Sequence, residues 1–134
     1  MTDLSKQQLQ ALKEDMRAGR DVLRDGLEDA LRREGHANLV ENMDRVHDSG
    51  DDAVADVLAD LNVAHLVAEY DELRDLDAAL LRVESGTYGD CVDCGEAIPF
   101  ERLETMPTAL RCVNCQEKFE QEGNRGRKDS TPSL

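Results

Sequence analysis

The segments Cys91-Val92-Asp93-Cys94 and Cys112-Val113-Asn114-Cys115 decide the fold, because they hold all four cysteines as two Cys-x-x-Cys pairs with seventeen residues between them. This spacing is typical of a structural zinc site, in which each pair lies on a tight turn and the linker brings the two turns together. Gly89 and Gly95 flank the first pair, where such turns need positive φ. We expect one structural Zn²⁺ on a closed set of four sulfur ligands, Cys91, Cys94, Cys112 and Cys115.

Two other chemistries also use cysteine pairs, namely two disulfides and a redox-active Cys-x-x-Cys site. Disulfides belong to oxidising compartments, and residues 1–8 lack the basic start and apolar stretch of a secretory signal. A redox site needs one such pair, whereas this chain has two. The sequence therefore favours zinc in a cytoplasmic protein. No apolar run approaches membrane-spanning length.

Apolar residues at helical spacing dominate the segment before the cysteines. Up to residue 46 they recur three, four or seven positions apart and form one stripe: Leu9, Leu12, Met16, Leu23, Leu27 and Leu31. Ser5 and Gln8 match a capping box, and a bend is predicted at Gly35. A polar turn around Asp48-Ser49-Gly50-Asp51 precedes a second helix over residues 51–84. Two long helices joined by a short turn predict an antiparallel coiled-coil hairpin.

The expected fold is thus mainly α. Residues 1–85 form the hairpin, with its tip at 47–53, and residues 86–122 form a small four-cysteine zinc-finger module that ends in a short C-terminal helix at 116–122. Residues 123–134, rich in Gly, Arg, Ser and Pro, are expected to be a disordered tail. With two Tyr, two Phe and no Trp, the chain favours a thin helical architecture over a wide core.

The formal net charge is −14, so the chain is repelled by nucleic acid and by anionic lipid. Between residues 51 and 84, ten acidic residues face only two arginines. A protein partner with a basic surface is therefore favoured over DNA. Solubility or adaptation to salt is an alternative explanation of the acidic outer face.

The stretch from Gly86 to Cys115 resembles the C4-type zinc finger of the DksA/TraR family. Besides the two cysteine pairs, it shares the family's Gly-Thr-Tyr-Gly lead-in, the Gly and Ile after the first pair, Arg102-Leu103, Pro107 and Ala109. The resemblance extends over about residues 5–120. It implies a bacterial transcription regulator that is not an enzyme. Such a protein binds RNA polymerase as a monomer and inserts its hairpin into the secondary channel to modulate initiation, without binding DNA.

The family's active members carry Asp-x-x-Asp-x-Ala at the hairpin tip. Residues 48–53 match it, so the resemblance assigns Asp48, Asp51, Asp52 and Ala53 to the region next to the polymerase active site. Asp and Ser at a helix start are also ordinary caps, which is the alternative interpretation.

The chain departs from the family where members that respond to the alarmone ppGpp carry basic side chains. The corresponding positions are not basic: Ala68, Asp75, Met106 and Gln116. Phosphates need Lys or Arg there, so a stringent-response-like role would not depend strongly on ppGpp. Arg102 is expected to have a packing or capping task. No pattern indicates catalysis, and His36, His47 and His65 lie far from the cysteines. The alternative function is a zinc-stabilised stress or adaptor protein with another protein partner.

Overall fold

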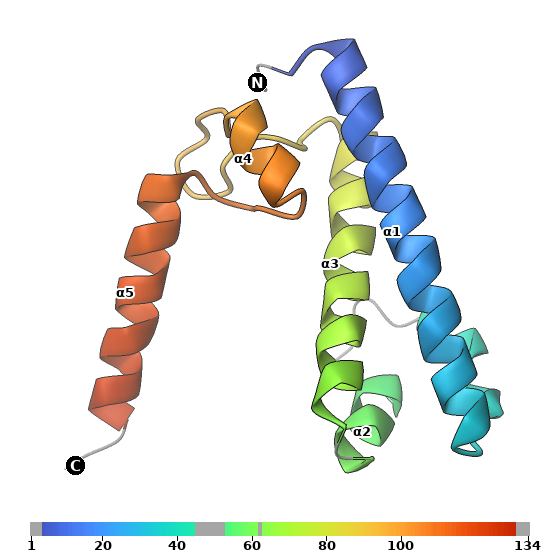
Figure 1. The fold of residues 1–134 in the computed structure, drawn as a ribbon. Coiled ribbons are helices and arrows are strands. Elements are labelled where there is room, and N and C mark those ends of the chain that lie inside the picture. The colour runs from blue at the N-terminus through green and yellow to red at the C-terminus, as the bar shows by residue number, and fades with distance from the viewer. Residues whose placement is uncertain (1–3, 45–52, 62, 131–134) are drawn as a thin grey trace. The chain divides into compact units, whose positions relative to one another are not determined.

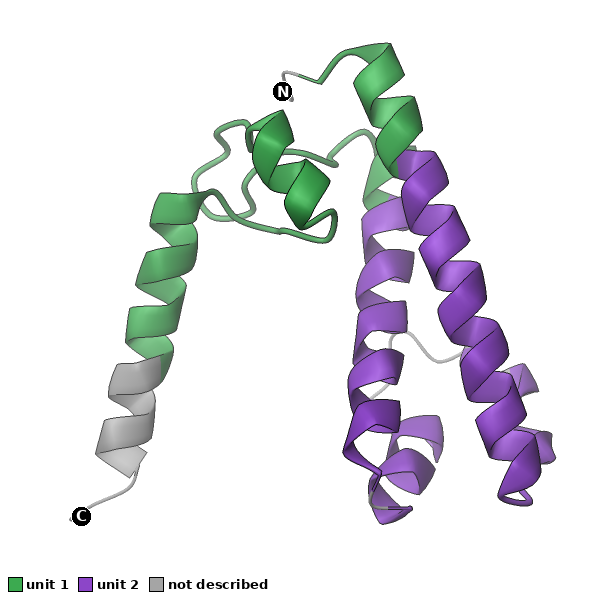
Figure 2. Ribbon diagram, viewed as in Figure 1, with its two compact units in different colours: residues 1–12, 82–134 green, residues 13–81 purple. Residues whose placement is uncertain are grey.

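The computed structural model describes residues 4–44, 53–61 and 63–130 (Figure 1). The described residues form helices and contain no strand, only an isolated antiparallel bridge between Asp90 and Ala97. The chain divides into two compact units, residues 1–12 with 82–134 and residues 13–81 (Figure 2). The predicted mainly helical fold, with a long helical hairpin and a four-cysteine cluster, is confirmed. In these residues no helix is long and apolar enough to cross a membrane.

Helix α1 runs from Lys6 to Arg33 and begins as its sequence predicts, but it ends at the predicted bend instead of continuing toward residue 46. The Gln8 amide donates to Ser5 Oγ at 3.0 Å and the Ser5 amide donates to Gln8 Oε1 at 3.1 Å, which is the predicted capping box. At the other end Gly35 has a φ of +82°, and the His36 amide donates to the Leu31 carbonyl oxygen at 2.7 Å. A left-handed glycine with this bond terminates a helix, so the chain bends where it was predicted to.

The second arm of the hairpin differs from the single helix predicted over residues 51–84. It consists of α2, Ala53–Asp60, and α3, Ala64–Ser85. Before it, two short 3₁₀ turns, η1 (Ala37–Leu39) and η2 (Glu41–Asp44), replace the predicted continuation of the first helix. The apolar pattern slips in register near Leu61, and a straight helix would have turned part of that pattern toward solvent.

The interruptions let five elements of the second unit share one core. Its buried residues come from α1, η1, η2, α2 and α3: Leu27, Ala30, Leu31, Leu39, Met43, Val54, Leu58, Leu66, Tyr70 and Leu73. Because Leu27 and Leu31 of α1 meet the first turns of α3, the two long helices run antiparallel, as predicted (Figure 1). The end of this unit is therefore a small helical bundle, not a bare pair of helices.

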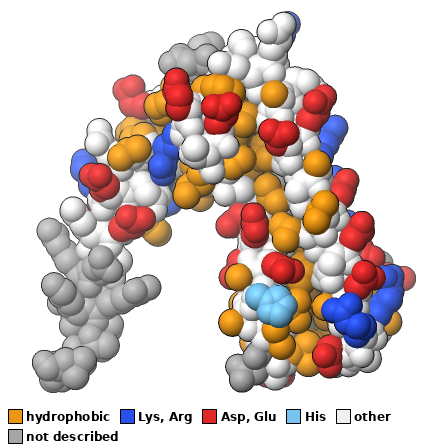
Figure 3. All heavy atoms as spheres, viewed as in Figure 1, with side chains coloured by type: hydrophobic (Ala, Val, Ile, Leu, Met, Phe, Trp, Pro, Cys, Tyr) orange, Lys and Arg blue, Asp and Glu red, His pale blue; other side chains and the backbone are white. Residues whose placement is uncertain are grey.

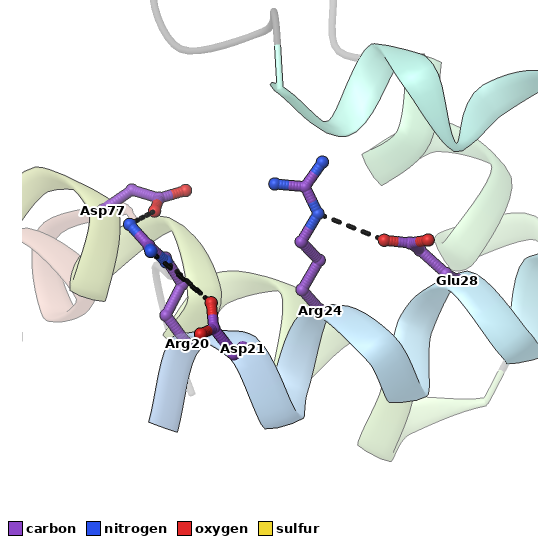
Figure 4. A network of polar contacts seen from close by, with 5 residues as sticks. All are labelled: Arg20, Asp21, Arg24, Glu28 and Asp77. Carbon is purple, nitrogen blue, oxygen red and sulfur yellow. Dashed lines mark hydrogen bonds and ion pairs between the residues drawn. The ribbon is translucent and has the colours of Figure 1, made fainter. Parts of the chain in front are cut away.

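Polar contacts along the hairpin are modest. Arg20 on α1 lies 3.9 Å from Asp77 on α3, and Arg24 Nε lies 3.1 Å from Glu28 Oε2 within α1 (Figure 4). Partly exposed ion pairs of this kind contribute between about 0 and 1 kcal/mol each. The close approach of the helices depends more on packing, since a Cβ at Gly19 would already touch Leu76 Cδ1 at 3.8 Å.

Two more helices belong to the other unit. Helix α4 runs from Phe100 to Thr105, and α5 runs from Val113 to Ser130. Helix α5 is longer than the predicted 116–122 and includes residues that were expected to lie in a disordered tail. Its Gln, Glu and Lys residues between 116 and 122 are good helix formers, and Gln116 Nε2 donates to Glu120 Oε2 at 3.0 Å across one turn.

Candidate metal centre

Glycine turns and backbone hydrogen bonds shape the first cysteine pair. Gly89 and Gly95 have φ of +91° and +78°, as predicted for the residues that flank the pair. The Cys91 amide donates to the Glu96 carbonyl oxygen at 2.8 Å, and the Gly95 amide donates to the Cys91 carbonyl oxygen at 3.0 Å. These bonds fold residues 91–96 into a tight turn that presents both sulfurs on one side.

The second pair is held at the start of α5. Cys112 precedes the helix and Cys115 lies in its first turn, where the Gln116 amide donates to the Cys112 carbonyl oxygen at 2.9 Å. Arg102 on α4 donates from Nε to the Arg111 carbonyl oxygen at 3.0 Å. It therefore caps the backbone just before the second pair, in line with the structural task predicted for it.

Tyr88 joins the two halves of the finger. Its side chain is 2% exposed, and its hydroxyl donates to the Pro107 carbonyl oxygen at 2.7 Å. Burial raises the pKa of Tyr88 to about 12, although Arg82 opposes the shift. The phenol therefore remains a donor at neutral pH and keeps the loop after α4 against the segment before Cys91.

The four cysteines are close enough to share one metal ion. They are free thiols, and all four sulfurs lie within 4.8 Å of one another, with Cys94 Sγ and Cys112 Sγ 3.9 Å apart. Zn–S bonds of about 2.3 Å at tetrahedral angles place sulfurs about 3.8 Å apart. The donor set fits one structural Zn²⁺ and leaves no position for a reacting water.

The thiols differ in how readily they ionise. Burial opposes ionisation of Cys91, but the backbone amides of Cys94, Cys112 and Asp93 donate to its sulfur and lower its pKa to about 6. Contact with the Cys112 thiol and burial raise the pKa of Cys115 to about 12. Without a cation between them, neighbouring thiols resist a second negative charge. One Zn²⁺ ion shared by the four sulfurs would offset this repulsion. With four sulfur ligands it would stabilise the fold and not activate water.

A second layer of contacts surrounds the cluster, and the sequence did not predict it. Arg111 Nε donates to Asp93 Oδ2 at 2.7 Å, and the Arg111 guanidinium lies 4.0 Å from the centroid of the Phe119 ring. Asp93 belongs to the first cysteine pair, Arg111 precedes the second, and Phe119 is on α5. The sequence gives one signal for these contacts, namely that Asp93 is adjacent to Cys94 and Arg111 is adjacent to Cys112.

The other predicted residues have separate outcomes. Asp48, Asp51 and Asp52 of the tip lie outside the described residues, while Ala53 is exposed as the first residue of α2. Non-basic side chains stand at the positions compared with the ppGpp-responsive members: Ala68, Asp75, Met106 and Gln116. Among the described residues, the metal-binding cluster contains cysteines and neither His36 nor His65.

Comparison with known proteins identifies the finger. Residues 86–121 match the family model of the prokaryotic dksA/traR C4-type zinc finger. The RNA polymerase-binding transcription factor DksA of Caulobacter vibrioides is 44% identical over 57 residues, which are 42% of this chain and 40% of that protein. General stress protein 16O of Bacillus subtilis is 37% identical over 67 residues, 50% of this chain and 40% of that protein.

The fold is similar to that of a solved relative over most of the chain. The structure of the transcription factor DksA2 from Pseudomonas aeruginosa matches with a TM-score of 0.60 and 26% identity, covering 90% of this chain and 88% of that one. The chain thus carries a zinc finger of the dksA/traR C4 type, and its fold over most of its length is similar to that of a DksA protein. In sequence alignments, the chain matches between 34% and 40% of the length of three of its curated relatives.

Proposed function

We propose that this protein regulates bacterial transcription by binding RNA polymerase directly. The fold, which matches DksA2 over 90% of the chain, carries the proposal. Several of its relatives are named RNA polymerase-binding transcription factors. In the proposed mode, a cytoplasmic monomer inserts its hairpin into the secondary channel of polymerase and modulates initiation through the tip.

Charge supports a protein partner over DNA. Helix α3 carries six acidic residues against two arginines, and the net charge of the chain is −14. Acidic side chains are spread over the face of the molecule drawn in Figure 3. Such a surface repels nucleic acid and is attracted to a basic funnel on a protein, which speeds association and fixes orientation more than it sets affinity.

A dependence on ppGpp is not part of the proposal. Asp75 on α3 and Met106 after α4 stand where cationic side chains would be needed, and Asp75 would repel phosphate. We expect a weak or absent ppGpp effect in transcription assays with polymerase that lacks its own separate ppGpp site. An enhancement of several fold in that assay would contradict the charge argument.

Competition for polymerase tests the main proposal. Fluorescently labelled DksA of Caulobacter vibrioides is bound to bacterial RNA polymerase core enzyme, and the zinc-loaded protein is titrated in. Displacement of the labelled protein is expected, together with altered transcription from a ribosomal promoter in vitro. If the protein fails to displace labelled DksA at concentrations at which unlabelled DksA displaces it completely, polymerase binding at that site is refuted.

The similarity to general stress protein 16O favours a second candidate, a zinc-stabilised stress or adaptor protein with another partner. The same competition separates the two. An adaptor of this kind leaves labelled DksA bound, whereas a polymerase regulator removes it.

A further inference from the structure

A groove opens beside the zinc cluster, between the first cysteine pair and the first turns of α5. It has a volume of about 410 Å³ and is lined by Asp93, Cys94, Cys115, Lys118, Phe119 and Glu122. The lining thus combines two of the four cysteines, one aromatic residue, two acidic residues and one lysine. All six residues belong to the same compact unit.

The wall of the groove is held in place by the contacts of Arg111. The hydrogen bond of 2.7 Å from Arg111 Nε to Asp93 Oδ2 holds Asp93 in place on the groove lining. The Arg111 guanidinium lies over the Phe119 ring, 4.0 Å from its centroid. The Arg111 side chain is 17% exposed, so it acts from behind the wall and not as part of an open surface. A groove formed in advance lowers the ordering cost of binding.

The groove is electronegative. Four thiolates and one Zn²⁺ sum to −2, and Cys94 and Cys115 of this set line the cavity. Glu122 adds one negative charge and Lys118 one positive charge, while Arg111 neutralises Asp93. A cation is therefore attracted, and a phosphate is repelled.

The groove also has an apolar side. Phe119 is 51% exposed, although Arg111 covers part of its ring. Five of the seven exposed large hydrophobic residues in the described part of the chain lie in this finger and α5: Val92, Met106, Leu110, Val113 and Phe119. Of these five residues, Phe119 lines the groove, so its ring supplies the apolar surface of the groove.

We propose that this groove binds an arginine side chain that a protein partner presents beside an apolar residue. The planar guanidinium packs on the exposed part of Phe119 and donates to Glu122 and to the thiolate sulfurs. Arginine suits the site better than lysine because it combines a flat cation, several donors and weak hydration. This inference holds whether or not the partner is RNA polymerase.

Peptide titration of the zinc-loaded full-length protein tests the proposal. The probes are the acetylated and amidated pentapeptides Ala-Leu-Arg-Leu-Ala and Ala-Leu-Glu-Leu-Ala, followed by amide NMR shifts. The arginine peptide is expected to shift amides of residues 93–94 and 115–122 and to bind more weakly as salt rises. Glu122→Gln should weaken binding about two- to fivefold, and Phe119→Ala about tenfold.

Controls separate the groove from general charge and from loss of folding. Glu104→Gln removes an exposed acid of α4 that does not line the groove and should bind the peptide as the wild type does. Each variant is checked for zinc content and an unchanged amide spectrum, and Glu122→Gln tests the proposal alone if Phe119→Ala fails to fold.

Three results would each overturn the proposal. The first is equal shifts with both peptides. The second is equal affinity of Glu104→Gln and Glu122→Gln, whatever its value. The third is that the groove amides do not shift with the arginine peptide. They shift instead when a single-stranded oligonucleotide is added, or when the protein dimerises with rising concentration, as seen by sedimentation.

Discussion

At the zinc cluster, the protonation of individual thiols sets how strongly the metal can be bound. Cys91 has its pKa lowered to about 6 by backbone amides, despite its burial. Cys94 and Cys115 have pKa values raised above the ordinary thiol value, for Cys115 to about 12. At pH 7, Cys91 is therefore largely ionised before metal arrives, while Cys94 and Cys115 still carry protons.

This difference predicts proton release on zinc binding. Zinc displaces the protons of Cys94 and Cys115, so at least two protons should be released per ion at pH 7, and zinc affinity should rise with pH. Calorimetric titration in buffers of different ionisation enthalpy counts the protons. Release of fewer than one proton per ion would show that the thiols are already ionised at pH 7. The pKa values of Cys94 and Cys115 would then not be raised.

Loss of one ligand should affect the finger far more than the hairpin. Structural zinc contributes roughly 10–16 kcal/mol in zinc-finger peptides, so Cys112→Ser is expected to lose zinc and unfold the finger while α1 and α3 stay helical. Elemental analysis and circular dichroism measure the two effects. Asn114→Ser, an exposed change within the same cysteine pair, is the control and should retain zinc. A Cys112→Ser protein that keeps stoichiometric zinc and a folded finger would contradict the assignment.

At the scale of elements, much of the chain could be predicted because the signals are local. The cysteine spacing, the glycines at 89 and 95, and the Ser5–Gln8 capping box each act within a few residues, and all appear as expected. The break between Asp60 and Ala64 was not predicted, because no Gly or Pro marks it. Its only signal is a slip in the register of the apolar pattern near Leu61, which is also compatible with one irregular helix. The contact of Asp93 with Arg111 was missed because it spans eighteen residues and forms only after folding.

The small bundle built by these breaks makes its own prediction. Leu58 of α2 is 0% exposed and packs in the ten-residue core of the second unit, so Leu58→Ala should reduce the stability of the hairpin by about 2–5 kcal/mol. Urea denaturation followed by helical circular dichroism measures this, with zinc content unchanged. Val22→Ala on α1, where the side chain is 73% exposed, should change stability by less than about 0.5 kcal/mol. Equal effects of the two substitutions would mean that α2 does not pack as described.

At the scale of the whole molecule, the finger, the hairpin and the net charge of −14 support the proposal that this protein acts on another protein. The fold class could be predicted from the cysteine pairs and the helical periodicity, and the kind of zinc finger from the resemblance of residues 86–115 to the DksA/TraR pattern. The role of the tip could not be settled in this way. Asp48 and Asp51 lie outside the described residues, and acids at a helix start are also common caps.

A double substitution at the tip separates the two roles. If Asp48 and Asp51 are only caps, asparagine retains an acceptor for backbone amides, and Asp48→Asn/Asp51→Asn should fold and regulate normally. If they act within polymerase, the same change removes charge without altering shape. We expect the double variant to carry zinc and to compete with labelled DksA as the wild type does, yet to lose most of its effect on transcription. Affinity and regulation would then be separated, which capping cannot explain. Normal regulation by the double variant would show that the tip acids serve the turn alone.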